Sequence, residues 1–156
     1  MKEGAIQDHY PEEFAHCYGC GRLNDHGLKI KSRWEGDESV CRFEPQPYYT
    51  GGFPGFVYGG ILASLIDCHS SGTASAADWR QRDSSRAGEP PSRFVTASLK
   101  VDFVKPTPMG KVLELRSRTT EIKGRKITVS TELFVDGVIH VKGEAVMVRI
   151  PENTSW

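Results

Sequence analysis

The chain reads Tyr58-Gly59-Gly60-Ile61-Leu62-Ala63-Ser64-Leu65-Ile66-Asp67-Cys68-His69, and this stretch decides the fold. Apolar side chains recur here at the spacing of one helix face, which predicts a helix over residues 57–78. That face consists of Ile61, Leu62, Leu65, Ile66 and His69. The opposite stripe is small apart from one acid, and consists of Ala63, Ser64, Asp67, Ser70 and Ser71. Asp67 has no cation four residues away, so it needs another partner or a chemical role.

Two glycines open this predicted helix. Gly59 and Gly60 lie where the first backbone N–H groups have no acceptor within the helix, so they can donate to a polarised carbonyl or an anion. A donor of this kind and a carboxylate on one helix make a candidate hydrolytic site. The alternative, which these residues alone leave open, is an ordinary turn followed by a solvated Asp67.

Length and composition indicate one globular domain. The 156 residues include 38% hydrophobic and 26% charged side chains, and 20 basic residues balance 20 acidic ones. This balance gives no general field for nucleic acid or an anionic membrane, so we expect neither as a partner. No apolar run approaches the roughly 20 residues of a membrane-spanning helix, and the first residues lack the apolar core of a signal peptide. We therefore expect a cytoplasmic protein with reduced cysteines.

One cysteine pair has the spacing of a metal-binding turn. Cys17-x-x-Cys20 has a histidine on either side, so zinc could be bound by this pair with His16 or His26. A structural zinc site needs four ligands, however, and Cys41 and Cys68 are isolated in the sequence. We therefore expect a glycine-rich turn with small buried thiols and no metal.

The remaining pattern is that of strands. Residues 28–34 alternate apolar and polar side chains and form a hairpin with 40–43 around the turn 35–38. Alternation recurs over 95–103, 112–120, 127–135 and 138–150. An aromatic loop precedes the helix, either packed on the fold or lining a pocket, and a polar loop, 78–92, follows it. One helix and about six antiparallel strands predict an α+β fold in which the helix covers the apolar face of the sheet.

Three motifs carry a resemblance to a known family. They are Cys17-x-x-Cys20-Gly21 with Asn24 and Gly27-Leu28, the stretch from Gly52 to Asp67, and the run from Thr96 to Pro108. Together they resemble hotdog-fold acyl-CoA thioesterases of the phenylacetate-degradation (PaaI-like) type. The resemblance covers residues 17–150, which implies a hotdog thioesterase-like domain with an N-terminal arm, 1–16, and a C-terminal tail, 151–156.

The resemblance implies hydrolysis of acyl-CoA thioesters to free acid and CoA, without a cofactor, at the interface of a homodimer. In this family the backbone N–H after the histidine of a His-Gly-Gly motif polarises the thioester carbonyl, and this position is Gly59. The family's carboxylate, nine residues after that histidine, falls on Asp67 as nucleophile or general base. Tyr58 replaces the histidine. Its phenol can donate a hydrogen bond and orient the loop or the substrate, but it is a poor base at neutral pH.

Further positions are expected to contact the acyl-CoA. Gly60 and Ser71 lie on the same predicted helix, Cys68 follows the carboxylate where many relatives carry Glu or Thr, and Gly52 replaces an asparagine of some relatives.

The phosphates of CoA need cations. Arg125 and Lys126 form a compact basic pair after the Gly124 turn, and we expect them to serve. The polar loop after the helix offers an alternative group, Arg80, Arg82 and Arg86.

Two other functions compete with thioester hydrolysis. One is a non-catalytic acyl-CoA binding protein that kept the groove after losing the histidine. The other is a hotdog enoyl-CoA hydratase, which requires an Asp and a His five residues apart near the helix start, whereas the sequence has no His between residues 27 and 68. His69 lies on the apolar face, so we expect a core histidine there. A long exposed face of the sheet also makes a homotetramer of paired dimers an expectation.

Overall fold

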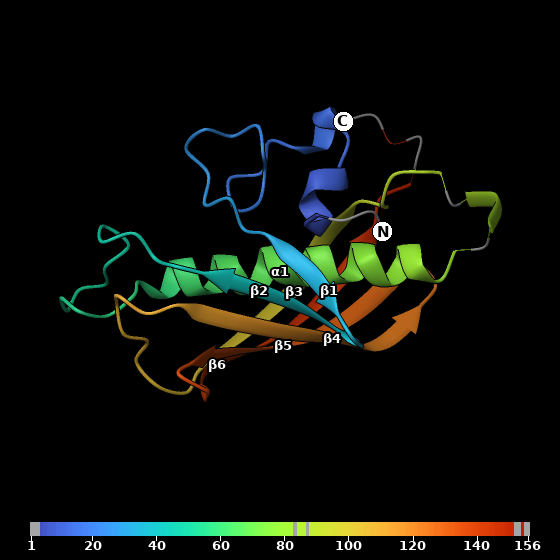
Figure 1. Cartoon of the computed structure of the whole chain (residues 1–156). Coiled ribbons are helices and arrows are strands. Elements are labelled where there is room, and N and C mark those ends of the chain that lie inside the picture. The colour runs from blue at the N-terminus through green and yellow to red at the C-terminus, as the bar shows by residue number, and fades with distance from the viewer. Residues whose placement is uncertain (1–3, 83, 87, 152–153, 155–156) are drawn as a thin grey trace.

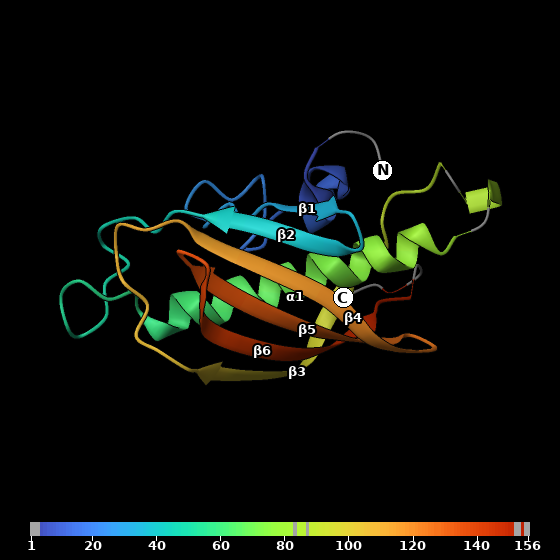
Figure 2. The same cartoon turned by 60° about the horizontal axis from the view of Figure 1, so that its bottom comes forward.

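The computed structural model describes residues 4–82, 84–86, 88–151 and 154. One long helix, α1 (Gly59–Arg80), lies in the concave face of a curved antiparallel sheet (Figures 1 and 2). The sheet has the order β1-β2-β4-β5-β6-β3. Its strands are β1 (Ser32–Glu35), β2 (Glu38–Phe43), β3 (Phe94–Phe103), β4 (Leu113–Lys123), β5 (Lys126–Val135) and β6 (Val138–Arg149). The α+β hotdog architecture expected from the sequence is confirmed.

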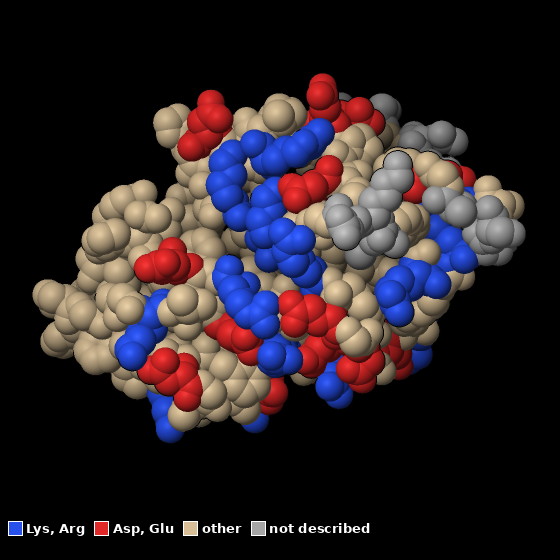
Figure 3. All heavy atoms as spheres, in the orientation of Figure 1, with Lys and Arg blue, Asp and Glu red and all other residues tan. Residues whose placement is uncertain are grey.

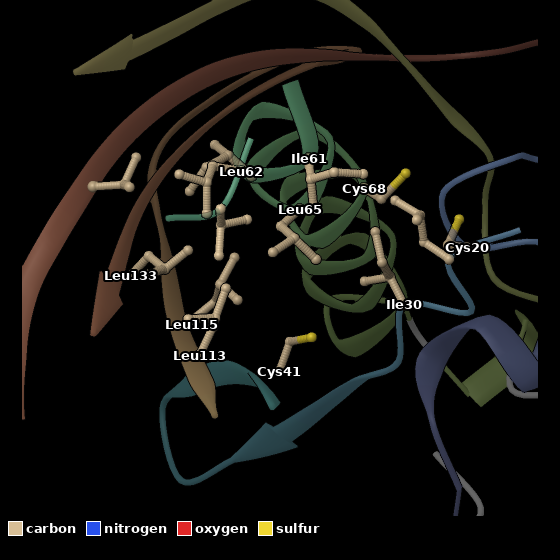
Figure 4. Packing of buried hydrophobic residues seen from close by; sticks show 14 of the residues in the cluster. Cys20, Ile30, Cys41, Ile61, Leu62, Leu65, Cys68, Leu113, Leu115 and Leu133 are labelled. Atoms are coloured by element: carbon tan, nitrogen blue, oxygen red, sulfur yellow. The ribbon is translucent and has the colours of Figure 1, made fainter. Parts of the chain in front are cut away.

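The main core lies between the first half of α1 and the sheet. Leu65 and Ile66 are fully buried, as the helical spacing predicts, and they pack among apolar side chains of β4, β5 and β6 (Figure 4). The helix begins and ends two residues later than predicted. Tyr58 is extended, because its N–H bonds to the Tyr49 carbonyl and thereby fixes the chain ahead of the first turn.

The second half of α1 is also covered on its other side by the N-terminal segment. This segment includes the short 3-10 helices η1 (Ile6–His9) and η2 (Glu12–Phe14). Ile6 packs on Ala76, and the Tyr10 hydroxyl lies 3.2 Å from Ser75 Oγ. The domain boundary at residue 16 stays a prediction. Residues 1–3 of the expected arm and 152–153 and 155–156 of the expected tail lie outside the described residues.

The link 104–112 joins two strands that are not neighbours in the sheet, since β3 pairs with β6 and β4 pairs with β2 and β5. Two details differ from the sequence expectations. The first strand begins at Ser32 instead of residue 28, because the N–H groups of Leu28 and Ile30 bond to the carbonyls of Tyr18 and Gly19 at 2.8 and 3.0 Å. Ser70 does not belong to the open stripe of α1. It is buried against β5, where its Oγ lies 3.1 Å from Thr131 Oγ1.

Charges of both signs alternate on the surface. In Figure 3 the blue and red side chains lie next to one another across the face that carries β1 and β2. Arg42 pairs there with both Glu35 and Glu114, and Arg116 pairs with Glu38. No helix among the described residues is both long and apolar enough to cross a membrane.

Candidate active site

Asp67 lies on the side of α1 that faces the edge strand β3. Its carboxylate is half-buried, and the Thr96 hydroxyl of β3 donates a hydrogen bond to Asp67 Oδ1. Burial raises the pKa of Asp67 above its ordinary value, and the bond from Thr96 only partly opposes this effect. Among the described residues no cation pairs with this carboxylate. Asp67 is therefore a desolvated acid whose negative charge the fold leaves without a counter-charge.

The start of α1 presents backbone donors. Because the helix begins at Gly59, the N–H groups of Gly59 and Gly60 have no acceptor within it. A Cβ on Gly60 would meet the Tyr58 ring, because this ring folds back over the first turn. Tyr58 itself is 57% exposed, which leaves its hydroxyl accessible beside these donors. The first turn of α1 can thus hold a carbonyl oxygen.

Gly59 and Asp67 are too far apart in one chain to act on one carbonyl group. Eight residues separate them on the helix, which corresponds to about 12 Å along the axis. A nucleophile and an oxyanion donor must both lie about 3 Å from the reacting group. One copy therefore supplies two half-sites, one at each of these positions.

The strand beside both half-sites is open. β3 is the last strand of the sheet order, and nearly all of its residues are exposed on both faces. Val95, Leu99 and Phe103 are 43%, 38% and 55% exposed. A Cβ on Gly59 would lie 3.5 Å from the Phe103 ring, so this open strand passes beside the start of α1. An open strand edge of ten residues, with exposed apolar side chains among them, is a template for pairing with another chain.

The other predicted substrate contacts are dispersed. Ser71 is half-buried, and its Oγ lies 3.5 Å from the carbonyl of Phe94 at the start of β3. Gly52 is exposed in the aromatic loop, where it lines an open hollow of about 630 Å³ with Gly55 and Met109. Cys68 is 7% exposed and points away from this loop, toward the N-terminal segment (Figure 4). The roles assigned to these residues stay predictions.

Only some of the basic residues expected to bind the phosphates of CoA lie together in the structure. A hollow of about 660 Å³ lies at the far end of α1 and is lined by five arginines, namely Arg82, Arg86, Arg93, Arg125 and Arg149. Arg125 thus joins two members of the alternative group. Lys126 is not among the lining residues, and the Arg80 guanidinium lies 4.9 Å from the centre of the Trp34 ring.

The charge of this hollow is only partly balanced. Asp78 accepts from Arg82 at 3.2 Å and from Arg149 at 3.0 Å, while Glu13 and Glu89 are the acids that line it. No ion pair joins Arg125 to another described residue. Among the residues that the structure describes, the arginines of this hollow therefore outnumber its acids.

His69 is a core residue, as its position on the apolar face predicts. It is fully buried, with Nδ1 at 2.8 Å from Ser32 Oγ and Nε2 at 3.1 Å from the Ser39 carbonyl. Burial lowers its pKa to about 4, so the ring is neutral at pH 7. It faces away from Asp67 and takes no part in the candidate site.

Comparison with known proteins identifies the family. Residues 54–139, which include the start of α1, Asp67 and β3, match the family model described as the thioesterase superfamily. The chain belongs to the thioesterase superfamily. A crystal structure of a thioesterase superfamily protein from Shewanella loihica PV-4 is 39% identical, covers 91% of this chain and all of its own, and superposes with a TM-score of 0.68.

A curated relative of this superfamily member carries a functional name. The acyl-coenzyme A thioesterase THEM4 of Xenopus laevis is 32% identical over 113 residues, which make up 71% of this chain. The matched part is 45% of the THEM4 length, so the chain spans about half of that relative.

Two distant structures share the fold. They are the E. coli PaaI protein from the phenylacetic acid degradation operon, 15% identical with a TM-score of 0.64, and smu.793 from Streptococcus mutans bound to acetyl CoA, 14% identical with a TM-score of 0.65. PaaI covers 80% of this chain and 81% of its own, and smu.793 covers 85% and 99%. The hotdog thioesterase resemblance drawn from the three motifs is confirmed.

Sequence reasoning missed a thiol cluster in this thioesterase superfamily chain. Cys68 is not isolated, because its sulfur lies 3.8 Å from Cys17 Sγ and both lie within 4.8 Å of Cys20 Sγ. The thiols of Cys20 and Cys68 act on the Cys17 sulfur and lower its pKa, and the same contact with Cys17 raises the pKa of Cys68. All four cysteines are free. No spacing rule links residue 20 to residue 68, so only the tertiary structure reveals the third sulfur.

The histidines proposed for that turn lie elsewhere. His16 and His26 are both exposed, and neither belongs to the cluster of Cys17, Cys20 and Cys68. The zinc set of two cysteines and one of these histidines is therefore not the one that the fold brings together.

Proposed function

We propose that the chain hydrolyses acyl-CoA thioesters to free acid and CoA, at a site that two copies form together. The observation that carries this proposal is Asp67, a half-buried carboxylate that has no counter-charge among the described residues and lies beside the open strand β3. The THEM4 relative is named as an acyl-coenzyme A thioesterase, and smu.793, which has the same fold, is bound to acetyl CoA. Both support acyl-CoA as the substrate class.

Asp67 has two chemically consistent roles. As a nucleophile, its carboxylate attacks the carbonyl carbon, the C–S bond breaks, CoA leaves as the thiolate and takes a proton, and water then hydrolyses the mixed anhydride. As a general base, it takes a proton from the water that attacks the same carbon. Burial raises the pKa of this carboxyl, which makes Asp67 a stronger base than an exposed aspartate.

The carbonyl oxygen gains negative charge in both routes. We assign its stabilisation to the N–H of Gly59 from the second copy, because the first turn of α1 holds donors that the helix does not use. Gly60 lets the chain approach closely, and the exposed Tyr58 hydroxyl lies where it can orient the substrate. Tyr58 positions the thioester in this scheme and moves no proton.

A dimer that pairs two β3 strands brings the half-sites together. If two identical β3 edges pair antiparallel, the start of one α1 faces the middle of the other. Gly59 of one copy can then approach Asp67 of the other, although about 12 Å separates these two residues along the helix of a single copy. The exposed apolar side chains of β3 support this interface. Association of two such dimers into a homotetramer, through surfaces other than β3, is a further part of the proposal.

The arginine hollow is our candidate for the phosphates of CoA. It begins at Arg93, three residues and about 10 Å of strand before Thr96, which contacts Asp67. A pantetheine arm can bridge that span. We expect Arg125→Ala to raise KM for acyl-CoA several-fold but not for the matching acyl-pantetheine, which lacks the phosphates, while Lys126→Ala changes neither.

Steady-state hydrolysis of an acyl-CoA panel, with free thiol detected, tests the proposal. The panel includes short, long and aromatic acyl groups. Asp67→Asn should lower kcat/KM by about 10³-fold without unfolding the protein, because the amide keeps the bond from Thr96 but cannot act as base or nucleophile. The matched control is Asp37→Asn in the β1–β2 turn, which should hydrolyse like the unchanged protein.

A non-catalytic acyl-CoA binding protein is the second candidate, and the Tyr58 ring folded over the first turn of α1 favours it. A chain that binds acyl-CoA but releases no thiol from any thioester, with or without Asp67, would establish this alternative.

The four cysteines of the chain are all free, which supports a reducing compartment. We therefore propose that the protein resides in the cytoplasm.

A further inference from the structure

Three sulfur atoms from two separate parts of the chain converge beside α1. Cys17 and Cys20 come from the turn that follows the N-terminal segment, and Cys68 comes from the helix. Figure 4 shows Cys20 beside Cys68. The proposed hydrolysis uses none of these thiols. The three Sγ atoms lie within 4.8 Å of one another, whereas the fourth cysteine, Cys41, lies apart in β2.

We propose that Cys17, Cys20 and Cys68 bind one Zn²⁺ ion as thiolates, with water in the fourth position. This site ties the N-terminal turn to α1 next to Asp67. It is independent of the proposed hydrolysis, because zinc content can be measured without any substrate.

The spacing of the sulfur atoms fits a zinc ion. With Zn–S bonds of about 2.3 Å, two thiolates of a tetrahedral site lie about 3.8 Å apart. Cys17 Sγ and Cys68 Sγ are 3.8 Å apart without any ion. The contacts to Cys20 are within 4.8 Å, so a small side-chain rotation completes a face of the tetrahedron.

The turn is shaped around the Cys68 sulfur. A Cβ on Gly19 would overlap Cys68 Sγ, so only glycine lets the helix cysteine enter between Cys17 and Cys20. Gly21 is equally constrained, because a Cβ there would lie 2.5 Å from the Ala15 carbonyl oxygen. The Gly21 N–H closes the turn with a 2.8 Å bond to the Cys17 carbonyl.

A disulfide explains the cluster less well. It needs two sulfur atoms about 2.05 Å apart, whereas Cys17 and Cys68 are 3.8 Å apart, and it leaves the third thiol unused. Cys17 is only half-buried, so solvent reaches the cluster from its side. That access supplies the water for the fourth position, as in zinc sites with three protein ligands.

Metal analysis of the full chain tests the proposal. We would purify it under reducing conditions without chelator, measure zinc per chain by mass spectrometry, and titrate the metal-free protein with Co²⁺. The unchanged protein should bind one equivalent and show the intense sulfur-to-cobalt absorption of a thiolate site. Cys68→Ser and Cys17→Ser should each weaken binding by at least about tenfold, whereas Cys41→Ser, a buried cysteine outside the cluster, should bind normally.

Folding and oxidation are controlled in the same samples. Circular dichroism identifies any variant that fails to fold, and Cys17→Ser carries the test if Cys68→Ser unfolds, because Cys17 is half-buried. The proposal is overturned if the reduced, folded protein takes up no metal, or if the serine variants bind as much zinc as the unchanged protein. The proposal is also overturned if the protein forms a Cys17–Cys68 disulfide and its reduced form binds no zinc.

Discussion

The two halves of α1 contain similar polar side chains but differ in what satisfies them. In the second half the buried hydroxyls of Ser70, Thr73 and Ser75 bond to Thr131, to the His69 carbonyl and to the Ser92 carbonyl. In the first half the Gly59 amide has no acceptor within the helix and Asp67 has no cation among the described residues. The comparison teaches that polar groups paired inside the fold stabilise it, while those left open along an edge strand are available to a substrate.

Mixing two inactive variants gives the strongest test of the open half. Gly59→Pro removes the amide proton and adds a ring, which the first helical position and the extended Tyr58 accept, and a Cβ at this position meets the Phe103 ring at an ordinary contact distance of 3.5 Å. We expect this change to lower kcat by about 10²–10³-fold. After unfolding and refolding together with Asp67→Asn, half of the dimers should contain one intact shared site.

Such a mixture should recover about a quarter of the unchanged activity at equal proportions, because each mixed dimer keeps one site of two. Refolding each variant alone is the control and should recover nothing. If the mixture stays inactive although mass analysis shows mixed dimers, Gly59 and Asp67 act in the same copy. The proposal that two copies share each site would then be wrong.

The buried polar contacts of α1 are tested by the pH dependence of the unfolding free energy, through His69. The pKa of His69 falls from 6.5 to about 4 on folding, so the unfolded chain binds more protons between these values. The unfolding free energy should therefore be fully present above about pH 6.5 and should decrease as the pH falls toward 4. One pKa unit corresponds to about 1.4 kcal/mol, so this loss amounts to about 3 kcal/mol.

His69→Leu should abolish that pH dependence and cost about 1–3 kcal/mol at pH 7, because the Ser39 carbonyl loses its buried partner. Urea unfolding at pH 7 and pH 5 measures both effects, and His26→Gln on an exposed turn is the control. If the unfolding free energy changes equally between pH 7 and pH 5 in the unchanged protein and in His69→Leu, His69 is not the buried neutral group described here.

Two glycines sharpen the contrast at a smaller scale. Gly19→Ala should lower the unfolding free energy by about 1–3 kcal/mol, because the new methyl group overlaps the Cys68 sulfur in a closed part of the molecule. Gly52→Ala should leave stability within about 0.5 kcal/mol, since nothing lies within 4 Å of a Cβ there. Thermal melts of both variants measure this difference in stability. Equal melting temperatures for Gly19→Ala and Gly52→Ala would contradict the close packing of the turn around Gly19.

The fold could be predicted almost completely because its signals are local. Residues 58–69 repeat apolar side chains at helical spacing, and Asp136-Gly137 marks the hairpin between β5 and β6. Strand pairing was harder, because alternation shows that β3 and β4 exist but not which neighbours they choose. The role of the N-terminal segment was also hidden, since its mixed charges and aromatics show no period, yet Ile6 and Tyr10 are buried on α1.

The sequence by itself determined the long helix, the antiparallel sheet and the family, because periodicity and motifs are properties of neighbouring residues. Only the tertiary structure decided that Asp67 lies half-buried with no cation beside it in the described part of the chain, that arginines from distant segments share one hollow, and that Cys68 meets Cys17 and Cys20. These are contacts between residues far apart in the chain, and their distances depend on how the elements pack.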